Sequence, residues 1–323
     1  MSDVPGKTYF STLSRRTGFK TDSLEKVFRI IVILGRIWGL PELAGKLALK
    51  GGTALHGLVF GFRRLSVDID LNYIGSIDRE TMQNDREDIR KTLLLLFRDL
   101  EYRADEPVSM YAEEQFNVHY TNCGGGADRL KLEINYLERL PVLGTVQGRI
   151  RHPFDGLDGV DVLSYRSEEL FAGKLNALLW RATPRDIYDA DLIAGGVHPF
   201  DGPLLRKMTL FFLSLSPGDV RTMRLDAIEN VTDKTIRDIL RPMFSKTDVP
   251  DLAAMKKNIL GFVQPMLDLT PDERRFFDVF YGERRMEQDL LFGELSVPQG
   301  LSRHPAIIWR LMQLGRKNGG GYF

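Results

Sequence analysis

The feature that most constrains the fold is the stretch 49–73, which reads LKGGTALHGLVFGFRRLSVDIDLNY. Apolar and polar residues alternate near its end, through Val67, Asp68, Ile69, Asp70 and Leu71. Successive side chains of a β-strand point to opposite faces, so both aspartates are predicted to share one face. Two neighbouring carboxylates repel each other, and a divalent cation such as Mg²⁺ relieves this repulsion by binding their oxygens. The alternation therefore predicts a strand that carries a metal-binding pair, Asp68 and Asp70.

A glycine pair, Gly51 and Gly52, lies between a strand predicted over residues 47–50 and Thr53, a suitable N-cap for a helix over residues 54–60. Glycines at a helix start let backbone N–H groups approach a phosphate, and the helix dipole favours the anion. A phosphate-binding turn followed about fifteen residues later by paired aspartates is typical of a nucleotidyltransferase. An ordinary turn and a solvated strand face are the alternative for each feature taken alone.

Two segments of the chain carry a recognisable pattern. The first reads LKGGTAL and continues into R-x-S-x-DIDL, in which Arg64 and Ser66 precede the aspartates. The second spans residues 168–193 and reads EELFAGKLNALLWRATPRDIYDADLI. Both resemble the AbiEii-like nucleotidyltransferases, which are toxins of type IV toxin–antitoxin and abortive-infection systems in the polymerase-β-type superfamily. The resemblance covers residues from about 25 to 195, and the C-terminal third carries no recognised motif.

The resemblance implies a reaction and its partners. The expected reaction moves a nucleoside monophosphate from an NTP to an acceptor hydroxyl and releases pyrophosphate, with Mg²⁺, or alternatively Mn²⁺, as cofactor. The implied acceptor is the tRNA 3′ end, so the enzyme would inhibit translation and growth. A separately encoded antitoxin is expected to counter it.

The same resemblance adds candidate residues. Glu133 lies in the middle of a predicted strand, where the superfamily places a third metal-binding carboxylate, although a solvated glutamate explains it equally well. Lys174 corresponds to an active-site lysine that binds triphosphate oxygens, a task suited to its compact charge. Asp186 matches an active-site acid and is expected to pair with Lys174 or Arg185. Asp189 is interpreted as an acid that favours the helix dipole.

The remaining expected contacts surround the nucleotide. The glycine pair and Thr53 are expected to bind the triphosphate, with Ser66 and Lys174 as side-chain contacts. Ser66 precedes Asp68 by two residues and is expected on the same strand face. We hypothesise that modification of Ser66 silences the enzyme, because an added phosphate would repel the aspartates and the incoming NTP.

The pattern over the whole chain predicts an α+β fold, a mixed sheet of the polymerase-β type followed by a large helical region. Residues 1–165 are predicted to form the nucleotidyltransferase domain with the catalytic aspartate pair. Residues 166–323 are predicted to form a helical domain that completes the active site through Lys174 and Asp186 and is a candidate to bind the acceptor. Strands are expected at the following positions: 108–112, 116–122, 129–135, 148–151 and 160–163.

Composition narrows the class of protein. The 323 residues are 43% hydrophobic and 27% charged, as in a soluble globular protein. No run approaches the ~18 apolar residues of a membrane span, and no signal peptide is evident, so a membrane partner is not expected. Cys123 is the only cysteine, which excludes an intramolecular disulfide and predicts a cytoplasmic location.

Two other functions stay open. The formal net charge is zero, so charge does not announce a nucleic-acid partner, and a protein hydroxyl is an alternative acceptor. The third reading is a catalytically silent protein that binds a nucleotide or a partner. Retention of Asp68, Asp70 and Lys174 argues against that reading.

Overall fold

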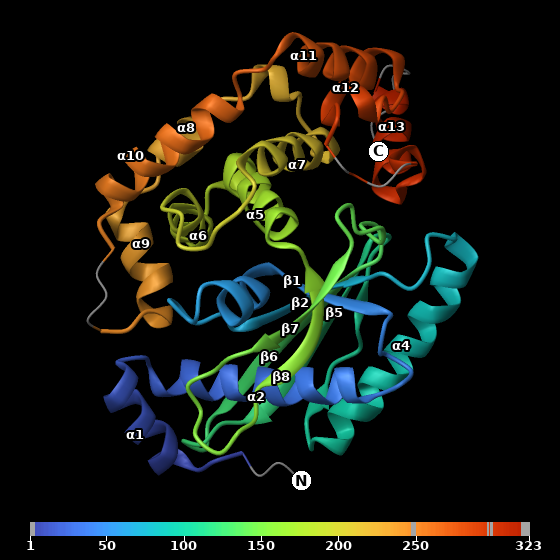
Figure 1. The fold of residues 1–323 in the computed structure, drawn as a ribbon. Helices are drawn as coiled ribbons and strands as arrows, with labels where there is room; N and C mark the ends of the chain where they lie inside the picture. Colours follow the sequence, from blue (N-terminus) through green and yellow to red (C-terminus); the bar gives the residue numbers. More distant parts are fainter. Residues whose placement is uncertain (1–3, 247–249, 296, 298–299, 318–323) are drawn as a thin grey trace. The chain divides into compact units, whose positions relative to one another are not determined.

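The computed structural model describes residues 4–246, 250–295, 297 and 300–317 (Figure 1). The chain has the predicted mixed α/β fold, with a mixed sheet followed by a helical C-terminal region. It forms two compact units, which are described separately. The first consists of residues 1–141, 145–165 and 237–249, and the second consists of residues 142–144, 166–236 and 250–323.

The first unit is built around an eight-stranded mixed sheet within the described residues. Its order is β3-β5-β6-β2-β1-β8-β7, and β4 pairs with β5. Strands β2 and β6 run parallel, as do β1 and β8, and the other pairs are antiparallel. The strands have these bounds: β1 (Leu47–Lys50), β2 (Asp68–Tyr73), β3 (Arg103–Ala104), β4 (Val108–Ser109), β5 (Glu113–Thr121), β6 (Ala127–Asn135), β7 (Thr145–Ile150) and β8 (Val160–Tyr165).

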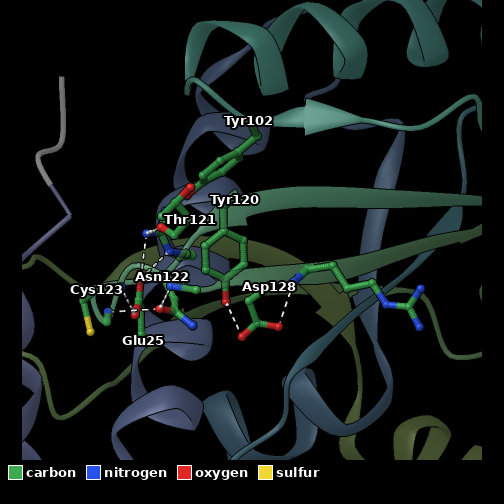
Figure 2. Close-up of polar contacts among 11 residues, drawn as sticks. Glu25, Tyr102, Tyr120, Thr121, Asn122, Cys123 and Asp128 are labelled. Carbon is green, nitrogen blue, oxygen red and sulfur yellow. Dashed lines mark hydrogen bonds and ion pairs between the residues drawn. The ribbon is translucent and has the colours of Figure 1, made fainter.

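Helices α2 and α4 cover one face of this sheet. Phe97 of α4 lies against Phe116 of β5, with 6.0 Å between ring centroids, and the Arg29 guanidinium of α2 lies 4.1 Å from the ring centroid of Tyr120. Figure 2 shows how Glu25 of α2 fastens the β5–β6 turn by accepting a hydrogen bond from the Cys123 backbone N–H at 2.8 Å. The helical and short turn-like elements of this unit are α1 (Lys7–Thr17), α2 (Thr21–Gly39), α3 (Gly51–Ala54), the π-helix η1 (Leu55–Val59), α4 (Arg79–Asp99) and η3 (Arg241–Met243).

Strand alternation gives the sheet an apolar and a polar face. On the side of α2 and α4, Ile69 and Leu71 of β2 are buried beside Leu132 and Ile134 of β6. The other face carries charged side chains, and the register places Asp70 beside Glu133 of β6 and opposite Lys50 of β1. This outcome follows directly from the period of two in the sequence of β2.

The region after β1 differs from the prediction. The helix was expected over residues 54–60 with Thr53 as its N-cap, but α3 begins at Gly51 and continues into the π-helix η1. The Thr53 hydroxyl donates to the Asp68 carbonyl oxygen at 2.5 Å, so it joins the helix to β2 instead of capping the helix. The strand expected over residues 108–112 is confined to Val108–Ser109.

The second unit is helical. Its helix α5 packs against α6 and α7, and α6 packs against α10 (Figure 1). The buried core includes Phe171 and Leu175 of α5, Ile187 of α6 and Phe211 of α7. The elements are α5 (Ser167–Arg181), α6 (Pro184–Ala194), α7 (Gly202–Leu215), η2 (Val220–Thr222), α8 (Asp226–Glu229), α9 (Asp233–Leu240), α10 (Leu252–Val263), η4 (Gln264–Met266), α11 (Pro271–Asp278), η5 (Val279–Glu283), α12 (Gln288–Phe292), η6 (Leu301–Arg303) and α13 (Pro305–Lys317). Across the described part of the chain, no helix is both long enough and apolar enough to cross a membrane.

Candidate active site

The glycine pair fits closely against the start of β2. Gly51 has a φ of +68°, a conformation that residues with a Cβ rarely adopt, and a Cβ added there would overlap the Asp70 Oδ2 atom. A Cβ at Gly52 would lie 2.7 Å from the Ser66 Oγ atom. Glycine is therefore required twice, because the backbone at the start of α3 approaches one aspartate and the serine of the R-x-S-x-D segment.

The carboxylates gather on the polar face of the sheet. Asp68 and Asp70 are half-buried on β2, and Asp70 is the register neighbour of Glu133. The Lys131 ammonium lies 3.0 Å from the Glu133 Oε2 atom. Burial opposes protonation of Lys131, but its hydrogen bond to Glu133 and the charges of Asp68, Glu133 and Asp70 outweigh burial and raise its pKa. Lys131 is thus the internal counter-ion of three carboxylates.

A fourth carboxyl group, that of Glu113, lies close enough to Glu133 for their negative charges to repel each other. Burial and then the charge of Glu133 raise the pKa of Glu113, and the two side chains share a hydrogen bond. The sequence prediction missed Glu113 and Lys131. Lys131 and Glu133 are two residues apart on β6 and therefore share a face, but the pairing of β6 with β2 is a tertiary feature that no local pattern reveals.

The protein offers a metal ion few ligands on this face. Within the part of the chain that the structure describes, no three histidine, cysteine, aspartate or glutamate side chains form a group that could hold a metal. Mg²⁺ commonly uses only one or two protein carboxylates and takes its other ligands from substrate phosphates and water. Asp68 and Asp70, two residues apart on one strand face, fit that mode of binding.

The side chains of the R-x-S-x-D segment lie against the glycine turn. Arg64 is 1% exposed and donates from Nη1 to the Leu65 carbonyl oxygen at 3.0 Å. Ser66 is 6% exposed. It was expected on the strand, but β2 begins two residues later, at Asp68. The polar residues of this segment therefore pack within the site, and the Ser66 hydroxyl faces the turn at Gly52.

The candidate residues of the second unit form their own cluster. The Lys174 ammonium lies 3.2 Å from Asp186 Oδ1 and 3.0 Å from Asp189 Oδ2, and both carboxyl groups are fully buried. Burial opposes ionisation of Asp186, but the Lys174 charge and hydrogen bonds from Arg181 and Thr183 outweigh it and lower the pKa. Asp186 pairs with Lys174, as expected. The helix-dipole interpretation of Asp189 is wrong, because the residue is buried in an ion pair.

Comparison with known proteins decides the family. The family model "Nucleotidyl transferase AbiEii toxin, Type IV TA system" matches residues 32–280. The chain belongs to this AbiEii family. Members of the AbiEii family are nucleotidyltransferase toxins of type IV toxin–antitoxin systems, and the chain is accordingly a nucleotidyltransferase. The match spans both the aspartate pair and the Lys174 cluster.

The chain is also similar in fold to a protein of known structure. It is MenT4, a nucleotidyltransferase toxin from Mycobacterium tuberculosis H37Rv, with a TM-score of 0.61 and 17% sequence identity. The alignment covers 94% of the present chain and 98% of MenT4. At this identity the likeness establishes a shared fold. No curated protein sequence matches the chain significantly.

Proposed function

We propose that this enzyme transfers a nucleoside monophosphate from an NTP to the 3′ end of tRNA in a reaction that depends on Mg²⁺ or Mn²⁺. The observation that carries the proposal is the placement of Asp68 and Asp70 on one strand face, beside a positive-φ glycine turn that leaves no space for a side chain. Family membership supplies the reaction class. The acceptor comes from the resemblance, and it is the part of the proposal that most needs a test.

The residues of the first unit have distinct proposed roles. Asp68 and Asp70 would hold the cation through carboxylate oxygens, and the backbone N–H groups after Gly51 would bind the triphosphate, with Thr53 and Ser66 beside them. The bound cation supplies charge neutralisation on the phosphates and lowers the pKa of the attacking hydroxyl. Positioning and electrostatics dominate such a transfer, so the geometry of these groups sets the rate.

Three proposed site residues already have charged partners. Glu133 is proposed as a third cation ligand, which would require its carboxylate to leave the ion pair with Lys131 and approach the two aspartates. Lys174 is proposed as a triphosphate contact, and Asp186 is proposed as the acid that orients its ammonium. Because Lys174 also forms ion pairs with two buried carboxylates, its replacement tests stability as well as transfer.

Control of the enzyme is proposed to involve a separately encoded antitoxin. A phosphate on Ser66 would place negative charge beside the two aspartates and the triphosphate site, so it would silence transfer. Ser66 is 6% exposed, and a modifying enzyme would need the glycine turn to open locally. A tRNA acceptor and a chain with one cysteine fit a reaction in the cytoplasm.

The test measures transfer from each α-³²P-labelled NTP to total bacterial tRNA with Mg²⁺. Wild-type protein is compared with Asp68→Ala and with Asp161→Ala, which removes an exposed carboxylate from another strand of the same sheet. We expect label on tRNA with the wild type and Asp161→Ala but not with Asp68→Ala. Label on protein would instead favour the protein-modifying enzyme. The zero net charge is compatible with that alternative, because it does not indicate a nucleic-acid partner. Binding of NTP without any transfer would favour the catalytically silent protein.

A further inference from the structure

A polar cavity lies in the first unit, on the side of the sheet that faces α4. It has a volume of about 190 Å³ and lies where α4 begins and β6 ends. Tyr136 follows β6 on the apolar face, and its ring centroid lies 5.6 Å from that of Tyr73. Asp68 and Asp70 are on the opposite face, so this cavity is separate from the proposed active site. The polar and aromatic residues that line it are Arg79, Gln83, Arg86, Tyr111, Tyr136 and Arg139.

Three arginines line this cavity, and the buried Glu114 carboxylate, 3.7 Å from the Arg86 Nε atom, offsets part of their positive charge. Arg139 is 8% exposed, and its guanidinium donates to the carbonyl oxygens of Tyr136 at 2.7 Å and Ile77 at 3.0 Å. Burial lowers the pKa of Arg139, and Asp78 and two tyrosines act on it only through longer-range charge. Among the described residues Arg139 has no carboxylate hydrogen-bond partner. A buried guanidinium held by carbonyl groups alone keeps its positive charge available to an anion.

Arg86 is the second fixed guanidinium. Its Nη2 atom donates to the Ser109 hydroxyl at 2.7 Å and to the carbonyl oxygen of Glu113 at 2.9 Å. Its guanidinium carbon lies 4.6 Å from the ring centroid of Tyr136. The Arg86 Nε atom is 3.7 Å from Glu114 Oε2, which is too long for a hydrogen bond. Arg86 is therefore held in place by its terminal nitrogens, while Nε lacks a hydrogen-bond partner within the described chain.

The hydroxyl of Tyr136 is the sharper indication of a ligand. Tyr136 is 1% exposed, and its hydroxyl has no hydrogen-bond partner among the residues that the structure describes. A buried polar group left without a partner destabilises the fold, so native proteins supply a partner in nearly every case. Tyr136 lines the cavity, so a group bound there is a candidate to supply the partner.

The lining chemistry identifies the kind of group. Planar guanidinium groups match phosphate oxygens with paired hydrogen bonds, and a tyrosine hydroxyl adds one more donor. Tyr111, at the rim, is 64% exposed and offers a ring on which a base can stack. The volume is below the roughly 300 Å³ of pockets that enclose a whole small ligand, so it suits a phosphate whose attached base stays outside.

We propose that this cavity binds the phosphate of a nucleotide and that the base lies against Tyr111. The ligand is a free mononucleotide or the phosphate-bearing terminal nucleotide of an RNA, since both present the same chemistry. The site needs neither Asp68 nor a metal ion. Its existence is therefore independent of the transfer reaction proposed above.

Calorimetric titration in the presence of EDTA tests this site while suppressing metal-dependent binding. Wild-type protein is titrated with AMP, adenosine, inorganic phosphate and a short RNA with or without a 5′-phosphate. We expect AMP to bind at least tenfold more tightly than adenosine. If the 5′-phosphorylated RNA binds more tightly than AMP, the natural ligand is an RNA end, and if it binds more weakly, the ligand is a free nucleotide.

Two variants locate the binding. Arg79→Gln removes an exposed arginine of the rim and should weaken AMP binding about tenfold. Its matched control is Lys91→Gln, an exposed change on the same helix that should leave affinity unchanged. Tyr136→Phe removes one hydroxyl and should weaken AMP binding several-fold while the melting temperature without ligand stays the same or rises, because an unpaired buried group is removed.

Three results would overturn the proposal. One is equal affinity for AMP and adenosine, or no binding of either at millimolar concentration. Another is unchanged AMP affinity in both Arg79→Gln and Tyr136→Phe. The third is a lower melting temperature of Tyr136→Phe with unchanged affinity, which would mean that an ordered water alone satisfies the hydroxyl.

Discussion

The chain contains two clusters in which carboxylates surround a lysine, and the clusters differ in how deeply the carboxylates are buried. On β2 and β6, Asp68, Asp70 and Glu133 are half-buried around Lys131. In the helical unit, Asp186 and Asp189 are fully buried and Lys174 forms an ion pair with each of them. The carboxylates of the first cluster stay half-buried around a shared lysine, whereas the second cluster is closed by the ion pairs of its buried carboxylates, including one to Arg181.

The difference separates residues that are held for chemistry from residues that also hold the fold. Half-buried carboxylates on one strand face repel each other, so their presence lowers stability unless a cation binds. Buried carboxylates that lose their partner are far more costly, because a charge without a partner remains inside the protein. Substitutions in the two clusters should therefore act on different observables.

The largest effect is expected for Asp70→Asn. Loss of one carboxylate from the proposed cation site should reduce transfer at least about a thousandfold, since electrostatic stabilisation of the phosphates is the main source of rate. The rate of nucleotide transfer at saturating Mg²⁺ measures it, with Asp161→Asn as the control. A reduction of less than tenfold would show that the chemistry lies elsewhere.

Lys174→Met should affect stability next most strongly. It leaves the buried Asp186 and Asp189 without their shared ammonium, at a cost of about 3–5 kcal/mol. Urea unfolding measures this loss. The matched control is Arg149→Met, which breaks an exposed pair with Asp161 and should cost less than about 1 kcal/mol. Equal effects of the two substitutions would mean that the Lys174 cluster is not a structural ion pair.

Glu273 is another buried carboxylate with two cationic partners, and its contribution to stability should depend on pH. Burial opposes its ionisation, but hydrogen bonds from Arg206 and Lys207 outweigh burial and lower its pKa from 4.5 to about 2. A lowered carboxyl pKa adds stability that is complete above pH 4.5 and is lost as the pH falls towards 2, on the order of 3 kcal/mol. The stability difference between wild type and Glu273→Gln should be largest near pH 7 and shrink below pH 4.5. A difference that does not change with pH would contradict the assignment.

The smallest of these effects is expected for Gly51→Ala. The positive φ costs about 1–2 kcal/mol for a residue with a Cβ, and the new Cβ would also displace the Asp70 carboxylate. Gly61→Ala is a close control, because Gly61 has the same φ of +68° and no neighbouring atom within 4 Å of an added Cβ. Both variants should lose similar stability from φ, but only Gly51→Ala should also lose transfer.

The sequence predicted those strands and helices whose bounds depend on neighbouring residues in the chain. Strand β1 has the predicted bounds of Leu47–Lys50, and the alternation in β2 placed Ile69 and Leu71 in the core. Helix α5 ends at Arg181, as predicted from the sequence, but Ser167, which was expected to be its N-cap, is its first residue and Arg166 is the N-cap. In each case the period of apolar residues and the flanking turn signals contain the necessary information.

Tertiary pairing explains what the sequence could not predict. Thr53 reads as an N-cap, but its hydroxyl bonds to β2, and the helix begins two residues earlier. Asp189 reads as a helix-dipole acid, but it is buried against Lys174. Lys131 becomes the counter-ion of the carboxylates only because β6 pairs with β2 in one particular register. Partners that are distant in the sequence decide each of these outcomes.

The most direct test of this contrast measures melting temperature and transfer rate on the same preparations of Asp70→Asn and Asp189→Asn. The two substitutions make the same chemical change in the two clusters. We expect Asp70→Asn to abolish transfer while its melting temperature stays equal to that of the wild type or rises, and Asp189→Asn to lower the melting temperature by several degrees. Full transfer by Asp70→Asn, or its unfolding together with an unaffected Asp189→Asn, would contradict the account.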